Sequence, residues 1–158
     1  MKRFFLDSNV YDEFLESQEL LDLVLDATSQ GLIELVGTHV EPDELQATKQ
    51  NKPAKGIRLV SAHLELNANQ VDTEGFVIGL SRLDMARLFS DEDAELFTRL
   101  TANNPKHSED VLMIMTAKRE KATFVSQEMK RVPGICKEID LECISAQALG
   151  EWCRQNLD

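Results

Sequence analysis

The sequence has few residues that could bind zinc or form disulfide bonds. It contains three cysteines and three histidines in 158 residues. The number of cysteines is odd, their spacings match no common zinc motif, and no pair of histidines has the spacing of a zinc hydrolase. We therefore expect reduced structural thiols and no catalytic zinc.

Basic residues are scarce, and long apolar segments are missing. The chain has 17 lysines and arginines against 28 aspartates and glutamates, a formal net charge of −11. This balance disfavours a continuous basic nucleic-acid face, although it allows an acidic nuclease whose site is neutralised by metal ions. No apolar run is long enough to span a membrane, and Asp7 ends the first apolar run too early for a signal peptide. We expect a cytoplasmic protein without a membrane partner.

The order of apolar patterns predicts a parallel sheet in a single domain over the whole chain. Residues 4–6 form a short apolar run typical of a buried strand, residues 10–25 have helical spacing, and residues 32–36 predict a second strand. Strand–helix–strand is the local signature of a parallel sheet. Further short strands are expected at residues 122–125 and 141–144.

Polar side chains gather directly after two of the expected strands, with Asp7 and Asn9 after the first and Ser126 and Glu128 after the third. The carboxyl ends of parallel strands form one edge of the sheet, where ligand sites of open α/β proteins lie. We therefore expect these residues to share an edge.

Two further acids qualify by position. Glu44 follows the second strand, so its side chain either faces the edge of Asp7 or points away. Asp110 lies in the first turn of a largely apolar helix, where an acid costs free energy unless it is paired or binds metal. The four candidate carboxylates offer oxygen ligands alone, which suit Mg²⁺ or Mn²⁺ and the hydrolysis of phosphodiesters. They are Asp7, Glu44, Asp110 and Glu128.

Other acids are interpreted as parts of helix starts. Glu41 and Asp43 interact favourably with a helix dipole, and the acids at 91–93 follow Ser90 as an N-cap. Apolar spacing at residues 81–89 predicts a helix immediately before them.

One basic segment interrupts the acidic sequence, and no acid separates its members. It is either a solvated loop and helix start or a surface that contacts nucleic-acid phosphates. Its residues are Lys49, Lys52, Lys55 and Arg58.

Taken in order, these motifs resemble the PIN-domain ribonucleases, including their VapC-like members. The matching features are Asp7-Ser8-Asn9, Glu44, the helix 110–117 that begins with Asp110, and Ser126-Gln127-Glu128. The family's last motif normally reads Thr-Asn-Asp, so Glu128 is one methylene longer. The resemblance implies a three-layer α/β/α sandwich with a central, mainly parallel sheet of four or five strands.

The resemblance also implies a function and roles. It predicts a Mg²⁺- or Mn²⁺-dependent endoribonuclease, and the VapC-like members suggest the toxin of a toxin–antitoxin pair, with an antitoxin partner and a homodimeric state. Asp7 and Asp110 would bind the metal, Glu44 would complete the site or orient the attacking water, and Glu128 would be an outer ligand. Asn9 and Ser126 would hold carboxylates in place. The alternative is a PIN-fold protein without catalysis that binds a protein or RNA.

Overall fold

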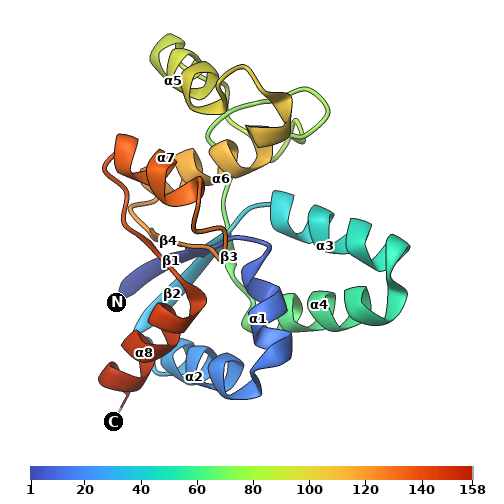
Figure 1. Cartoon of the computed structure of the whole chain (residues 1–158), viewed down its shortest axis with the longest axis vertical. Helices are drawn as coiled ribbons and strands as arrows, with labels where there is room; N and C mark the ends of the chain where they lie inside the picture. Colours follow the sequence, from blue (N-terminus) through green and yellow to red (C-terminus); the bar gives the residue numbers. More distant parts are fainter. Residues whose placement is uncertain (158) are drawn as a thin grey trace.

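A five-stranded parallel sheet forms the centre of residues 1–157, the part of the chain that the computed structural model describes (Figure 1). The strands are β1 (Lys2–Leu6), β2 (Ile33–Gly37), β3 (Asn69–Gln70), β4 (Thr123–Val125) and β5 (Cys143–Ile144). Their order is β3-β2-β1-β4-β5, so the first strand lies in the middle of the sheet. The predicted α/β fold with a parallel sheet of four or five strands is confirmed.

Helices cover both faces of the sheet. They are α1 (Val10–Glu16), α2 (Gln18–Ser29), α3 (Val40–Asn51), α4 (Pro53–Leu66), α5 (Asp91–Thr101), α6 (Ser108–Arg119), α7 (Val132–Glu138) and α8 (Ala146–Asn156). Side chains alternate along a strand, so Phe4 and Leu6 pack with α1, α2, α4 and α8, whereas Phe5 packs with α6 and α7. Within residues 1–157, none of these helices is both long and apolar enough to cross a membrane.

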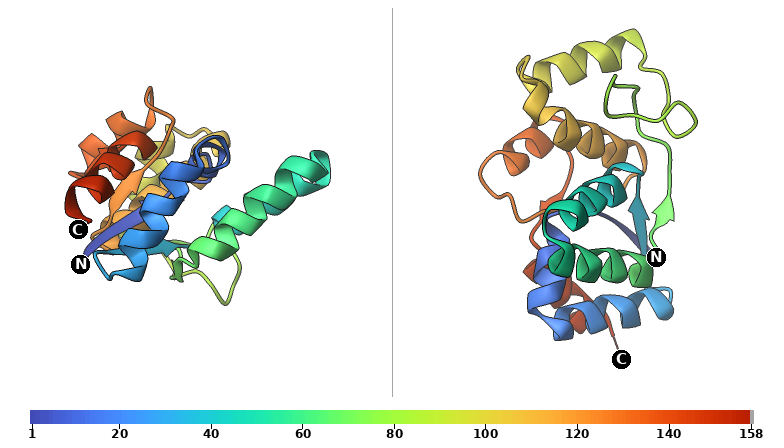
Figure 2. Two further views of the ribbon diagram at one scale, coloured as in Figure 1. Left: turned by 90° about the horizontal axis from the view of Figure 1, so that it is seen from below. Right: turned by 90° about the vertical axis from the view of Figure 1, so that its right-hand side faces the viewer.

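Helices α3 and α4 form an antiparallel hairpin that projects from the sheet, as the left view of Figure 2 shows. Lys52 separates them, and Pro53 occupies the first turn of α4, where its missing N–H is harmless. The two helices approach closely at Gly56, where an added Cβ would lie 2.1 Å from the Cα of Lys49. The hairpin carries the whole basic segment predicted from the sequence.

The segment between β3 and α5 differs from its predicted structure. Residues 81–89 form no helix but an irregular loop that a bridge between Thr73 and Ala86 holds in place. The expectation failed because Leu83 and Leu88, the apolar residues that suggested a helix, are 86% and 85% exposed. By contrast, Ser90 accepts a hydrogen bond from the backbone N–H of Asp93 and caps α5, as predicted.

Candidate active site at the carboxyl edge of the sheet

Asp7 lies at the centre of the carboxyl edge, directly after β1. Its backbone N–H donates to the carbonyl of Val125, and its side chain is 2% exposed. Oδ2 accepts hydrogen bonds from Asn9 Nδ2 and Ser126 Oγ, both at 2.7 Å. Burial raises the pKa of Asp7 to about 6, the bond from Ser126 opposes this rise, and the charge of Asp110 adds to it.

Asn9 and Ser126 also join the loops after the two neighbouring strands β1 and β4. Asn9 Oδ1 accepts from the backbone N–H of Gln127 at 2.9 Å, while Asn9 Nδ2 lies 3.3 Å from Ser126 Oγ. Ser126 Oγ accepts in turn from the backbone N–H of Glu128. The structure therefore brings Asp7, Asn9 and Ser126 together in one hydrogen-bonded group.

Glu41 is a second buried acid near this edge, and it has a structural role at the start of α3. Its carboxylate accepts hydrogen bonds from the backbone N–H and the hydroxyl of Thr38, whose Oγ1 accepts from Val40. The bond from the Thr38 N–H to Glu41 corresponds to one half of a capping box, whereas the Thr38 hydroxyl oxygen accepts from Val40 and not from Glu41. Burial raises the pKa of Glu41 to about 8, and the bonds from Thr38 oppose the rise.

Glu44 lies one helical turn further along α3 and belongs to the same acidic edge. Burial, followed by a hydrogen bond to Glu109, raises the pKa of Glu44 to about 8, and the charge of Asp7 contributes to this rise. Ser8 donates a hydrogen bond that opposes it. Oε2 of Glu44 is buried without a hydrogen-bond partner among the described residues. Such an atom has lost its contact with water and gained nothing in return.

Asp110 lies in the first turn of α6, on the face of the sheet opposite to α1. Residues 111–117 behind it are fully buried, whereas the Asp110 side chain is 28% exposed. Its Oδ2 accepts a hydrogen bond from Nη2 of Arg131, which lies immediately before α7. The charge of Asp110 adds to the raised pKa of Asp7, so the two carboxylates lie within electrostatic reach of each other.

Glu128 uses its carboxylate differently from the other three candidates. Its oxygens accept from the backbone N–H groups of Lys130, Arg131 and Val132 at 3.0, 3.0 and 2.8 Å. Burial pushes the pKa of Glu128 upward, but these bonds outweigh it and hold the pKa below its usual range. The side chain thus organises the turn into α7, and its role as an outer metal ligand stays a prediction.

The donor chemistry of the edge suits a hard divalent cation, but the ligands are not assembled around one position. Carboxylate oxygens of Asp7, Glu44 and Asp110 are the donors that Mg²⁺ and Mn²⁺ prefer, and the unpaired Oε2 of Glu44 suits a cation. Within residues 1–157, however, no group of three His, Cys, Asp or Glu side chains is arranged to hold a metal ion. Arg131 on Asp110 provides a physical reason for this.

The basic segment lies on the projecting hairpin. Lys49 and Lys52 are exposed, whereas Lys55 forms a 2.7 Å ion pair with Asp12 and Arg58 donates to the carbonyl of Leu15. Half of the segment is therefore attached to the neighbouring helix α1. Contact with RNA remains a prediction for all four residues.

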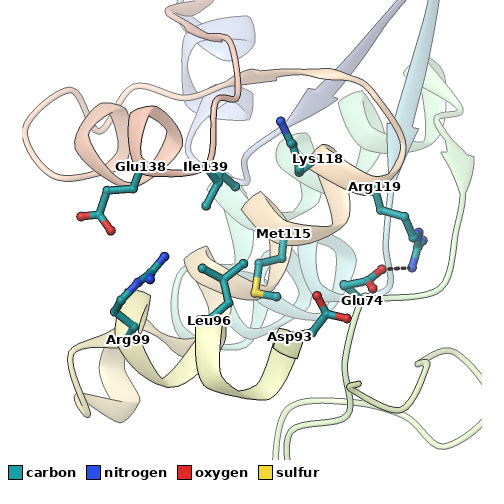
Figure 3. A pocket seen from close by; sticks show the side chains of 9 residues that line it. All are labelled: Glu74, Asp93, Leu96, Arg99, Met115, Lys118, Arg119, Glu138 and Ile139. Carbon is teal, nitrogen blue, oxygen red and sulfur yellow. Dashed lines mark hydrogen bonds and ion pairs between the residues drawn. The ribbon is translucent and has the colours of Figure 1, made fainter. Parts of the chain in front are cut away.

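A pocket of about 410 Å³ lies between α5, α6 and α7, away from the acidic edge (Figure 3). Leu96, Met115 and Ile139 supply apolar walls, and Arg119 forms an ion pair with Glu74 across one side. It adjoins the C-terminal half of α6, whereas Asp110 lies at the start of that helix. The pocket therefore shares no lining residue with the candidate site.

Comparison with known proteins supports the fold. No protein-family model matches the chain, and no curated protein matches it in sequence. Among solved structures, a chain of VapBC-1 from nontypeable Haemophilus influenzae has a similar fold, with a TM-score of 0.56 and 13% identity. The similarity covers 92% of this chain and 98% of that one. At this level of identity it shows a shared α/β fold and nothing finer.

Proposed function

We propose that the protein is a Mg²⁺- or Mn²⁺-dependent endoribonuclease with Asp7, Glu44 and Asp110 at its centre. The observation that carries this proposal is the convergence of three acids from β1, α3 and α6 on one sheet edge. Burial raises the pKa values of Asp7 and Glu44, and the neighbouring carboxylates add to the rise, a combination that is frequent at functional sites. The fold shared with a VapBC-1 chain supports a link to toxin–antitoxin proteins.

The residues would divide the work between binding and positioning. Asp7 and Asp110 would hold the cation directly, while Asn9 and Ser126 keep the Asp7 carboxylate in one orientation. Glu44 would complete the ligand set or orient the attacking water with its free oxygen. A bound Mg²⁺ or Mn²⁺ would supply the charge that activates water and stabilises the phosphodiester transition state.

The proposal also includes an assembly and a substrate. A VapBC-1 chain belongs to a toxin–antitoxin complex, so we propose a toxin-like role for this chain with an antitoxin as its partner. We also propose that the protein forms a homodimer and works in the cytoplasm. RNA would be the substrate, and the exposed Lys49 and Lys52 on the hairpin would contact its backbone.

A second candidate function is an RNA- or protein-binding module that lacks catalysis. Two observations favour it: Asp110 is paired with Arg131, and both oxygens of Glu128 are used by the turn into α7. In this case the acidic edge would retain the shape of a nuclease site without assembling its ligands.

Cleavage assays with and without a chelator distinguish the two functions. Purified protein is incubated with single-stranded and structured RNA in Mn²⁺ and in EDTA, beside the Asp7→Asn variant. Asp26→Asn is the matched control, because Asp26 is an exposed residue on α2. Cleavage lost in EDTA and in Asp7→Asn, but kept in Asp26→Asn, supports the nuclease. Equal cleavage under all conditions contradicts it, and RNA binding without cleavage favours the module.

A further inference from the structure

Arg131 is the basic residue that contacts the candidate site, and sequence reasoning did not anticipate it. Its Nη2 donates to Oδ2 of Asp110, and the two side chains are 33% and 28% exposed. The backbone N–H of Arg131 is bound by Glu128 at 3.0 Å, which fixes the point from which the side chain begins. Both the backbone and the side chain of Arg131 are therefore held, the one by Glu128 and the other by Asp110.

The pairing with Asp110 leaves part of the guanidinium unsatisfied. Nη1 of Arg131 is buried and has no hydrogen-bond acceptor among residues 1–157. A guanidinium presents its donors as a fork that matches two oxygens of one carboxylate or phosphate. A buried charged donor without an acceptor loses its hydration and gains no bond. Asp110 is thus an incomplete partner for Arg131.

We propose that Arg131 binds a phosphate group of the substrate. Asp110 pairs with Arg131 until a divalent cation replaces the guanidinium as the partner of Asp110. This inference rests on the proposed function, because it assigns Asp110 to a divalent ion. Once Asp110 turns to that ion, Arg131 loses its partner, and a backbone phosphate of single-stranded RNA offers the two oxygens that its fork requires. Arg131 then competes with metal when RNA is absent and binds substrate when metal is present.

RNA binding in the absence of metal tests whether Arg131 binds phosphate once it is no longer paired with Asp110. The Asp110→Asn variant removes the charge that holds Arg131, so in EDTA it should bind a fluorescein-labelled single-stranded RNA about fivefold more tightly than wild type. The salt dependence of this binding should steepen by about 0.7, the contribution of one phosphate contact to a single strand. Fluorescence anisotropy measures both quantities.

Double variants show whether the gain belongs to Arg131 or to the lost negative charge. Asp110→Asn combined with Arg131→Gln should lose the gain, whereas Asp110→Asn combined with Lys130→Gln should keep it. Lys130 is a matched control because it is exposed, adjacent and equally charged, and its backbone also donates to Glu128. Equal binding by the two double variants, or no gain in Asp110→Asn, would overturn the proposal.

Metal titration provides a second readout that requires no activity. Thermal melts in increasing Mn²⁺ should give a several-fold lower Kd for Arg131→Gln than for wild type, because the competitor for Asp110 is gone. Lys130→Gln should match wild type, and Arg131→Lys should fall between them because lysine keeps the charge without the fork. An unchanged Kd in Arg131→Gln contradicts the competition.

The proposed function and this inference fail in different ways. If wild type cleaves RNA in a chelator-sensitive manner and Arg131→Gln behaves as Lys130→Gln in every assay, the nuclease stands and the role of Arg131 is wrong. If wild type binds no Mn²⁺ and cleavage survives in EDTA, the proposal of a metal-dependent nuclease is wrong. The proposed replacement of Arg131 by a cation at Asp110 is then wrong as well.

Discussion

Replacing Asp7 with asparagine should stabilise the metal-free protein at neutral pH and much less at acidic pH. Burial raises the pKa of Asp7 from its ordinary value of 3.8 to about 6. One pH unit corresponds to about 1.4 kcal/mol, so ionised Asp7 costs the folded protein about 3 kcal/mol at high pH. For an acid whose folded pKa is raised, stability is fully present below the unfolded pKa and is lost as pH rises through the folded pKa.

The magnitude follows from the two pKa values. Wild type should lose about 2 kcal/mol through this group between about pH 4.5 and about pH 7.5, a loss that asparagine cannot show. Asparagine also fits the site, because its amide oxygen can accept from Asn9 and Ser126 while its NH₂ faces Ser8. The advantage of the variant over wild type should therefore grow by about 2 kcal/mol, or about 4–8 °C in Tm, over this range.

Thermal and urea unfolding in EDTA at the two pH values measure this change. Contributions from Glu41 and Glu44 appear in both proteins and largely cancel in the comparison. Asp26→Asn is the control, because Asp26 is an exposed aspartate on α2 and takes no part in the acidic edge. The reasoning is refuted if the difference between Asp7→Asn and wild type is the same at both pH values or if it shrinks as the pH rises.

Three further predictions concern the neighbours of Asp7. Mn²⁺ at ten times its Kd should stabilise wild type by about 1.4 kcal/mol in thermal melts, and Asp110→Asn by much less; equal shifts would exclude Asp110 as a ligand. Ser126→Ala removes a donor to a buried carboxylate and should cost about 2 kcal/mol in urea unfolding, and an unchanged midpoint would show that the bond is unimportant. Replacing Lys49 and Lys52 with glutamine should weaken RNA binding and lower its salt dependence in anisotropy titrations. An unchanged dependence of affinity on salt would show that these lysines are solvated surface residues without RNA contacts.

The centre of the fold could be predicted because local pattern and tertiary environment agree there. Residues 4–6 are apolar because β1 is buried on both faces, and Asp7 follows at the edge where parallel strands end. The same argument places Ser126 beside Asp7, since β4 is the direct neighbour of β1. The shared edge could be predicted from the local pattern, whereas the direct adjacency of β1 and β4 comes from the strand order of the sheet.

Other features depend on contacts that sequence periodicity does not contain. Strand β3 consists of two exposed polar residues, Asn69 and Gln70, and pairs with β2 without an apolar pattern of its own. Residues 81–89 have the spacing of a helix, but Leu83 and Leu88 are exposed, and Phe89 alone of these apolar positions packs against the core. Arg131 was missed because a guanidinium reaches its partner across the fold, and the relevant spacing is that between α6 and α7.

The sequence correctly placed Glu41 at the start of a helix, but it did not predict that the side chain is buried. The sequence indicated a favourable position at a helix start, and the structure shows a carboxylate that is 1% exposed and bonded to Thr38. Burial could not be inferred, because it arises from the packing of α3 against the sheet edge. A signal was nevertheless available: Thr38 and Glu41 are three residues apart, the spacing of a capping box.

The carboxylate of Glu128 and the position of Arg131 are parts of one arrangement. Glu128 reaches the backbone N–H groups before and within α7, and this anchors Arg131 where its side chain can fold back onto Asp110. At pH 7 a pKa of about 8 leaves Glu44 mostly protonated, while Arg131 balances Asp110. The proton on Glu44 and the guanidinium of Arg131 thus lower the negative charge of the acidic edge. A divalent cation that binds all three must displace both a proton and a guanidinium, so its affinity has to rise with pH and with anything that draws Arg131 away.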